Sequence, residues 1–417
     1  MQKAKTNWTY LILLILAGEA VFVLPFVLQR VFRSTVLEVF QINNTELGLC
    51  FAYYGITAMV SYFFGGPIAD RFEPRKLIAF SLWSTALGGL VYALYPGFFA
   101  LQLLYGYWGF TTIFLFWSPM IKATRIWGGI GDQGKAFGML DGGRGLIGAL
   151  FGLFAVLLFA NSLAENIEIN LDERREAFRW AVYGSTGLIV IIGVLIWFLL
   201  KSDAGRDEKI DHISIKQIGE VVKLPTVWLL MVIILCAYMG YKTTDVVSLY
   251  AREVLLHDEI NSARIGTFLL FMRPVSGVLV GFLADRSRTT LWLFISFLIV
   301  LLGSLWFASG LGHGYLAIFL VSIFTISGGV YAARALYFAV MKEGNIPLHL
   351  TGTAVGLVSV IGFTPDVFAG VVIGYLLDAN PGVVGHQHVF LLLAAFSVIG
   401  GLCAWRYHKI SKTGIGA

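Results

Sequence analysis

Long apolar runs follow one another along the whole chain, separated by short polar segments. Each run is about 20 residues long or longer, the length that a helix needs to cross a bilayer of roughly 30 Å. The runs lack the alternation of a lipid-facing barrel strand, so they predict helices. Twelve spans are expected, at residues 8–30, 46–69, 76–95, 98–124, 135–160, 178–200, 223–250, 262–284, 290–309, 313–340, 350–377 and 386–408.

The longest polar connections predict how the chain is divided. They cover residues 161–177 and 201–222, and the second lies at the centre of the chain, with six predicted spans on either side. We therefore expect an all-α membrane protein with two pseudo-symmetric six-helix lobes. The lobes would comprise residues 1–200 and 223–417, joined by a cytoplasmic linker at 201–222.

Composition excludes several other classes of protein. Of the 417 residues, 58% are hydrophobic and 13% are charged, whereas soluble proteins have about 45–50% apolar and about 25% charged residues. So few charges cannot cover a water-exposed surface, which excludes a soluble enzyme, a nucleic-acid-binding module and a disordered scaffold. The three cysteines lie in apolar runs without metal or disulfide spacing, and no metal site or cofactor is expected.

The loops differ in their content of lysine and arginine, which orients the chain. With both termini in the cytoplasm, 19 basic residues fall on the cytoplasmic side and five to seven on the other. A plasma (inner) membrane location with both termini inside is expected. The outer set comprises Arg174, Arg175, Arg179, Arg252 and Arg264, with Arg30 and Arg33 near the end of the first span.

One short pattern recurs at the ends of three spans. It consists of a glycine, three mostly apolar residues and an aspartate, at Gly66–Asp70, Gly281–Asp285 and Gly374–Asp378. A further glycine precedes the second and third copies by four residues, at Gly277 and Gly370, and such small-residue pairs let helices approach closely. Repeats within and between halves are typical of secondary transporters.

The segment around the first copy resembles the major facilitator superfamily. It reads Gly65-Gly66-Pro67-Ile68-Ala69-Asp70-Arg71-Phe72-Glu73-Pro74-Arg75-Lys76, similar to that family's loop 2–3 signature, G-x-x-x-D-R-x-x-R-[RK], and Asp285-Arg286-Ser287-Arg288 is a reduced copy. The resemblance implies a two-lobe bundle with one central cavity and alternating access by rocking of the lobes. It also implies a conformational latch on the cytoplasmic side, formed by Asp70, Arg71, Arg75, Asp285 and Arg286.

A weaker resemblance is to the organophosphate–phosphate antiporter branch, whose G-T-A-x-G region is similar to Gly352-Thr353-Ala354-Val355-Gly356. That branch carries a basic residue at mid-membrane in spans 1 and 7. Here Arg30 lies about a turn too far out, and span 7 has Lys242 where arginine is expected. Arg273 is instead similar to the arginine that oxalate, monocarboxylate and nitrate carriers of the superfamily place in span 8.

Ionisable residues at membrane depth cost several kcal/mol and are functional candidates. Asp141 and Arg144 are three residues apart, as are Lys242 and Asp245, so each pair could be a local ion pair. Arg273 and Asp366 could face each other across the cavity. The eight deep residues are Glu19, Asp141, Arg144, Lys242, Asp245, Arg273, Arg334 and Asp366.

These charges favour a secondary carrier of a small organic anion, either a carboxylate or a phosphate ester, coupled to protons or exchanging a counter-anion. The guanidinium fork of arginine suits such anions. Expected substrate-binding residues are Arg273, Lys242, Arg144, Arg334, Tyr54, Trp117 and Tyr241. Expected proton- or ion-coupling residues are Glu19, Asp366, Asp141 and Asp245.

Three alternatives remain open: a sugar-phosphate/phosphate exchanger, a multidrug-type efflux carrier and a transporter-like membrane sensor. An integral membrane enzyme is not expected, because the sequence offers no Ser–His pair, no His/Asp metal set and no phosphate-cradling glycine loop. The expected partners are the anionic substrate, a proton or counter-anion, and the lipid bilayer. The family resemblance implies a monomer.

Overall fold

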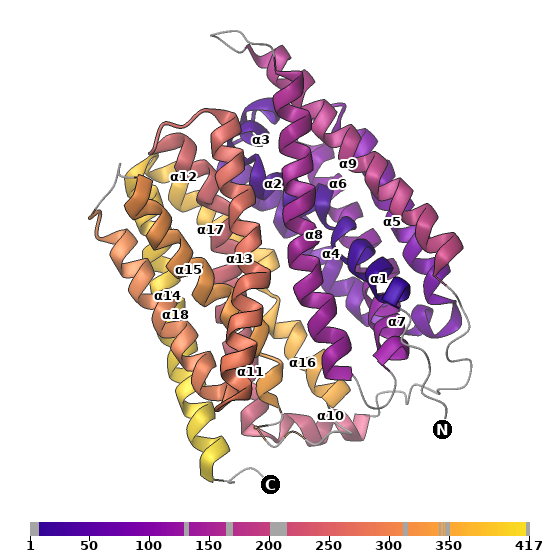
Figure 1. Cartoon of the computed structure of the whole chain (residues 1–417), viewed down its shortest axis with the longest axis vertical. Coiled ribbons are helices and arrows are strands. Elements are labelled where there is room, and N and C mark those ends of the chain that lie inside the picture. The colour runs from indigo at the N-terminus through magenta and orange to yellow at the C-terminus, as the bar shows by residue number, and fades with distance from the viewer. Residues whose placement is uncertain are drawn as a thin grey trace. The chain divides into compact units, whose positions relative to one another are not determined.

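The structure is a computed structural model, and its described part is helical throughout (Figure 1). It describes residues 8–128, 133–163, 170–200, 215–311, 316–341, 343–344, 346 and 351–413. The helices of the first half are α1 (Trp8–Ala20), α2 (Leu28–Val31), α3 (Arg33–Phe40), α4 (Asn44–Arg71), α5 (Pro74–Tyr92), α6 (Phe98–Gly109), α7 (Ser118–Gly128), α8 (Gln133–Ser162) and α9 (Leu171–Leu199). Those of the second half are α10 (Ile215–Val222), α11 (Pro225–Thr243), α12 (Val247–Glu253), α13 (Glu259–Asp285), α14 (Thr289–Ala308), α15 (Leu316–Leu336), α16 (Thr351–Gly362), α17 (Pro365–Ala379) and α18 (Val383–Thr413).

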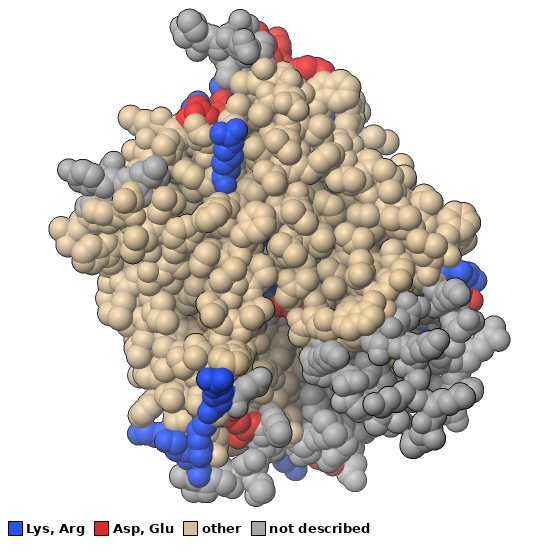
Figure 2. Space-filling model, viewed as in Figure 1, with Lys and Arg blue, Asp and Glu red and all other residues tan. Residues whose placement is uncertain are grey.

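The long helices account for the predicted spans. Nine helices of the described chain are long and apolar enough to cross a membrane, and a bent pair, Trp8–Ala20 with Val23–Val31, makes ten. The helices α4 and α5 occupy the second and third predicted spans. On the face drawn in Figure 2, charged side chains are sparse between the upper and lower ends, and the surface there is mostly uncharged. The prediction of an all-α membrane protein is confirmed.

Several spans are interrupted rather than straight. In span 1, a π-helix (Val23–Val27) follows α1 with a bend of 44°; Pro25 has no amide hydrogen to give to the preceding turn. In span 4, a π-helix (Phe110–Trp117) joins α6 to α7, just before Pro119. A 3₁₀ turn (Thr244–Val246) interrupts span 7, and span 11 breaks between α16 and α17, where Pro365 opens the second helix.

The chain divides into two compact units. Unit 1 comprises Met1–Ile42, Leu49–Ile210 and Asp258–Leu270, and unit 2 comprises Asn43–Gly48, Asp211–His257 and Phe271–Ala417. In unit 1, α5 packs against α9 and α1 against α8; in unit 2, α14 packs against α15 and α18, and α11 against α16 and α18. The division passes through α4 and α13. The expected linker begins in residues 201–214, outside the described residues.

Candidate functional site

Buried charges at the helix interruptions form two groups, one in each unit. In unit 1, Glu19 lies in the last turn of α1 and Arg144 on α8, with 3.4 Å between Arg144 Nε and Glu19 Oε2. Both side chains are less than a tenth exposed. The Arg144 guanidinium also lies over the rings of Phe22 and Trp117, at 5.4 Å and 5.8 Å from their centroids. Aromatic faces stabilise a desolvated cation, so these rings hold Arg144 in place.

Two glycines make room for this unit 1 ion pair. A Cβ added at Gly148 would lie 2.8 Å from Glu19 Oε1, and a Cβ added at Gly18 would lie 3.0 Å from Arg144 Cδ. Gly18 is on α1, beside Glu19, and faces Arg144. Gly148 is on α8, which carries Arg144, and faces Glu19. The helices α1 and α8 therefore approach closely where the two charges meet. The pair is therefore built into the packing of the two helices.

In unit 2, Lys242 and Asp366 form a second ion pair, with 2.5 Å between Lys242 Nζ and Asp366 Oδ1. The Tyr238 hydroxyl donates to the same carboxylate, 3.0 Å from Oδ1 and 3.2 Å from Oδ2. Lys242 lies in the last turn of α11 and Asp366 in the first turn of α17. Each charge thus lies at the helix end whose dipole favours it.

A second cation lies beside this pair. The Arg334 guanidinium, in the last turn of α15, is 3.8 Å from the ring centroid of Tyr241 and 5.6 Å from that of Tyr238. Lys242 Nζ is 5.5 Å from the Tyr238 centroid. Five side chains from three helices therefore form what we call the unit 2 cluster: Tyr238, Tyr241, Lys242, Arg334 and Asp366.

The two ion pairs of the candidate site, Glu19 with Arg144 and Lys242 with Asp366, join helices far apart in the sequence. The sequence allows local pairs, Asp141 with Arg144 and Lys242 with Asp245, and these remain a prediction; the structure pairs Arg144 with Glu19 and Lys242 with Asp366. The expected facing of Arg273 and Asp366 remains a prediction, and Asp366 lies in an ion pair with Lys242. The signals that the sequence carried were Pro25 and Pro365, which mark the breaks beside Glu19 and Asp366.

The other expected site residues occupy varied environments. Arg273 and Asp245 are buried in unit 2, Arg273 directly before Pro274 within α13 and Asp245 in the 3₁₀ turn of span 7. Asp141 is partly buried on α8. Tyr54 is 2% exposed and its hydroxyl shares a 2.7 Å hydrogen bond with Thr112 Oγ1, which anchors it within unit 1.

Part of the expected cytoplasmic latch is described. Arg71 is exposed at the end of α4, and Arg75 pairs with Glu73 at 3.3 Å. The exposed Arg286 guanidinium lies 4.0 Å from the ring centroid of Phe282. The side chains of Asp70 and Asp285 lie outside those that the structure describes, so the latch remains a prediction.

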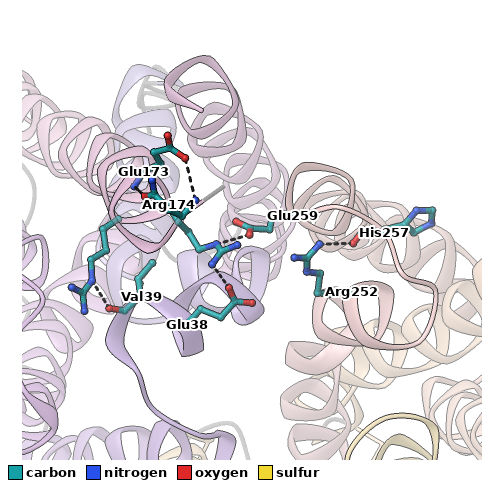
Figure 3. Close-up of polar contacts among 9 residues, drawn as sticks. Glu38, Val39, Glu173, Arg174, Arg252, His257 and Glu259 are labelled. Atoms are coloured by element: carbon teal, nitrogen blue, oxygen red, sulfur yellow. Dashed lines mark hydrogen bonds and ion pairs between the residues drawn. The ribbon is translucent and has the colours of Figure 1, made fainter. Parts of the chain in front are cut away.

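The arginines expected on the outer side bind acceptors. Figure 3 shows Arg174 between Glu38 and Glu259, with 2.5 Å from Nη1 to Glu38 Oε2 and 2.5 Å from Nε to Glu259 Oε1. Other outer arginines donate to carbonyl oxygens: Arg175 to Val39, Arg179 to Ala93 and Arg252 to His257. Arg30 and Arg33, placed near the membrane boundary by the sequence, are each 3% exposed within unit 1. Sequence reasoning missed Glu38 and Glu259, which lie near predicted span ends where polar residues are common.

A family model described as Major Facilitator Superfamily matches residues 9–365. The chain belongs to the major facilitator superfamily. It is therefore an integral membrane protein and a secondary transporter. Within the described residues, no group of three or more His, Cys, Asp or Glu side chains is arranged to hold a metal ion.

Relatives match this superfamily member over most of its length. The inner membrane protein YqcE of Escherichia coli is 25% identical over 94% of this chain and 93% of its own. The inner membrane protein YihN of the same organism is 24% identical over 95% and 94%. The lysosomal dipeptide transporter MFSD1 of Bos taurus is 22% identical over 82% and 73%.

Solved structures share the fold. A bacterial homolog of the human lysosomal transporter Spinster, inward-facing and occupied, has a TM-score of 0.75 at 16% identity, covering 97% of this chain and 98% of that one. The nucleoside transporter NupG has a TM-score of 0.68 at 14% identity, covering 95% and 99%. At these identities the likeness shows the fold alone.

Proposed function

We propose that the protein carries a small organic anion across the membrane by alternating access and that transport is coupled to protons. One observation carries this proposal. At membrane depth, unit 2 holds three basic residues, Lys242, Arg273 and Arg334, against two acidic ones, Asp245 and Asp366. A surplus of buried positive charge is costly unless an anion meets it. A substrate carboxylate or phosphate supplies that anion during transport.

The unit 2 cluster supports this role by its geometry. The Arg334 guanidinium, whose N–H groups lie in its own plane, is 3.8 Å from the Tyr241 ring centroid. A planar carboxylate or a phosphate accepts two such N–H bonds side by side. Lys242 adds a second positive charge from α11, and the phenol groups of Tyr238 and Tyr241 add donors of their own.

Proton coupling follows from competition for Lys242. A substrate oxygen that binds Lys242 Nζ takes it from Asp366, which now lies buried without its cation. We propose that Asp366 takes up a proton at this step. Glu19, paired with Arg144 in unit 1, is the second carboxylate proposed to take up a proton in this way.

We further propose an inner membrane location with both termini in the cytoplasm. The relatives YqcE and YihN are inner membrane proteins, which supports the location. The proposed orientation is supported by the excess of lysine and arginine in the loops assigned to the cytoplasm, 19 against five to seven.

A zwitterion such as a dipeptide is the second candidate substrate. The observation in its favour is that carboxylates lie beside the cations in both units, Asp366 beside Lys242 and Glu19 beside Arg144. An ammonium group would bind a carboxylate while the substrate carboxylate binds a cation. The relative MFSD1, a dipeptide transporter, supports testing this class.

A ligand screen tests the substrate class. The purified protein is heated with carboxylates, sugar phosphates, dipeptides or amphipathic cations at two pH values, and the melting temperature is recorded. We expect an anion to stabilise the wild type, and the stabilisation to be lost in Lys242→Ala and Arg273→Ala. Stabilisation by amphipathic cations alone, unaffected by these variants, contradicts the proposal and favours an efflux carrier.

Lys409→Ala is the matched control. Lys409 Nζ lies 5.4 Å from the Trp405 centroid, close to the 5.5 Å between Lys242 Nζ and the Tyr238 ring, but Lys409 is exposed near the C-terminal end of α18. Removing it deletes the same charge and a similar cation–π contact. Ligand stabilisation is expected to persist in Lys409→Ala, so a loss there as well would mean that total charge matters and the cluster does not.

A further inference from the structure

Four aromatic side chains of unit 1 lie beside the unit 1 ion pair, where the two π-helices of this unit are found. Phe22 directly precedes the π-helix of span 1, Phe26 lies within it, and Trp117 ends the π-helix of span 4. The Phe22 ring centroid is 6.2 Å from that of Phe26 and 6.5 Å from that of Trp117. Tyr62, on α4, has its ring centroid 6.5 Å from that of Trp117. We call these four residues the unit 1 aromatic group.

The π-helix of span 4 decides the direction of Trp117. The exposed side chains Leu103, Tyr107 and Phe110 follow one another at intervals of four and three residues, which is one face of a helix. Seven residues are about two full turns of an α-helix, so a regular span would return Trp117 to the face of Phe110. A π-helix bonds each residue to the fifth one along and has more residues per turn. Trp117 therefore falls short of two turns and points away from the exposed face.

Tyr62 also lies away from the most exposed face of its helix. On α4, Ile56, Val60 and Phe64 are four residues apart and each is more than half exposed, as expected of a lipid-facing stripe. Tyr62 is two residues from both Val60 and Phe64, about 200° around the helix. Tyr62 and Trp117 are nevertheless partly exposed. Each therefore keeps an open side that does not face the lipid.

Arg144 connects the aromatic group to a charge that an anion can meet. Its guanidinium lies 5.4 Å from the Phe22 centroid and 5.8 Å from the Trp117 centroid. A carboxylate bound to Arg144 therefore brings whatever is attached to it next to these rings. Phe22 and Trp117 are inclined at 66°, and Trp117 and Tyr62 at 89°, so the group offers both ring faces and ring edges. Aromatic rings attract one another in offset and edge-to-face arrangements beyond what their buried area provides.

We propose that the unit 1 aromatic group binds a flat ring of the transported anion, so that the substrate is an aromatic carboxylate. This inference rests on the proposed function, in which Glu19 gives up its cation to the substrate. A substrate oxygen binds Arg144 in place of Glu19, and the substrate ring packs against Phe22 and Trp117. π-Helical segments are frequent at functional sites, and aromatic side chains around a few polar groups are typical of ligand sites.

A second aromatic pair of span 4 provides a matched control. The rings of Phe110 and Phe114 stack with their centroids 4.7 Å apart, within the same π-helix as Trp117. Phe110 is 43% exposed and lies on the exposed face described above. Phe110→Leu therefore removes one ring of an aromatic pair, as Trp117→Leu does, but leaves the unit 1 aromatic group complete.

Paired ligands measure the preference for a flat ring. Benzoate, phenylacetate and 2-naphthoate are each compared with the ring-saturated acid, which has the same carbon skeleton and charge. The purified full chain in detergent is titrated with each acid, and the dissociation constant is obtained from the rise of the melting temperature with ligand concentration. We expect at least one aromatic acid to bind about tenfold more tightly than its saturated partner. The preference should disappear in Trp117→Leu and in Tyr62→Leu and persist in Phe110→Leu.

Equal dissociation constants within every pair of acids would overturn the inference, as would a preference that survives both Trp117→Leu and Tyr62→Leu, because the ring would then bind elsewhere. If gel filtration shows that Trp117→Leu does not fold, Tyr62→Leu decides alone. Absence of stabilisation by any of these acids also overturns the aromatic carboxylate. The proposed function fails separately, and only if the sugar phosphates and dipeptides of the ligand screen are without effect as well.

Discussion

Lys242 and Asp366 are held 2.5 Å apart, Nζ to Oδ1, and join the end of α11 to the beginning of α17 inside unit 2. Both side chains are largely buried. In such a place the cost of removing each charge from water is offset by the partner and by the helix ends. Replacing only Lys242 or only Asp366 by a neutral residue leaves the charge of the other one buried. Replacing both residues leaves neither charge of the pair.

Breaking this pair on one side should therefore destabilise more than removing both sides. We expect Asp366→Ala to lower the free energy of unfolding by about 3–5 kcal/mol. The double variant Lys242→Ala, Asp366→Ala should recover most of that loss. Equilibrium unfolding in mixed micelles measures both, and equal losses in the single and double variants would show that Lys242 left buried after Asp366→Ala costs nothing, contrary to this prediction.

A glycine next to the unit 1 ion pair gives the second prediction. In Gly148→Ala the new methyl group would lie 2.8 Å from Glu19 Oε1, so the carboxylate must shift away from Arg144. We expect a loss of about 1–3 kcal/mol in stability together with reduced transport. Gly142→Ala, on the same helix, adds its methyl group where no described atom lies within 4 Å. Gly142→Ala should keep the wild-type stability and transport. A similar loss of stability in Gly142→Ala would mean that the loss comes from the change in the helix backbone and not from the displacement of Glu19.

The fold could be predicted from the sequence because each span is an apolar run of bilayer length. The interruptions could be predicted only in part. Pro25 and Pro365 mark two of them, but no proline lies in the 3₁₀ turn at Thr244–Val246, where tertiary packing overrides the local preference.

The sequence singles out candidate residues one by one but not the pairs that they form. Glu19 and Asp366 stand out because a carboxylate in an apolar run is costly. Their partners come from other helices, and one sequence gives no measure of which helices pack together. Asp378 illustrates the same limit: its recurrence after Gly374 indicated close helix packing, while its hydrogen bonds to Asn44 and Thr45 needed the structure.

A buried pair at the start of α13 yields a third prediction. The Glu259 side chain is 2% exposed and bonds Arg174, whereas Glu176 and Arg179 form an exposed pair on α9, with side chains 53% and 34% exposed. A double-mutant cycle with alanine should give a coupling energy of roughly 2 kcal/mol for Arg174 with Glu259. Solvent screening should limit the coupling of Arg179 with Glu176 to about 0.2–1 kcal/mol. Equal coupling energies would mean that burial does not strengthen the first pair.

The last prediction concerns pH and Glu343, between α15 and α16. Burial raises the pKa of this carboxyl, but hydrogen bonds from the Thr290 hydroxyl and the N–H groups of Thr289 and Thr290 outweigh it, so that the pKa is lowered. These bonds cap the start of α14. A lowered pKa means that the folded protein binds a proton less readily than the unfolded chain, whose glutamate has its ordinary pKa of 4.5.

The stabilisation from Glu343 should therefore be complete above the ordinary pKa and be lost as the pH falls through the lowered value. We expect the melting temperature of the wild type to fall more steeply on acidification than that of Glu343→Gln, whose amide does not titrate. Glu176→Gln, which neutralises an exposed glutamate on α9, serves as the control and should follow the wild-type curve. If Glu343→Gln and the wild type lose stability in parallel as the pH falls below 4.5, the carboxylate does not act as a charged cap of α14.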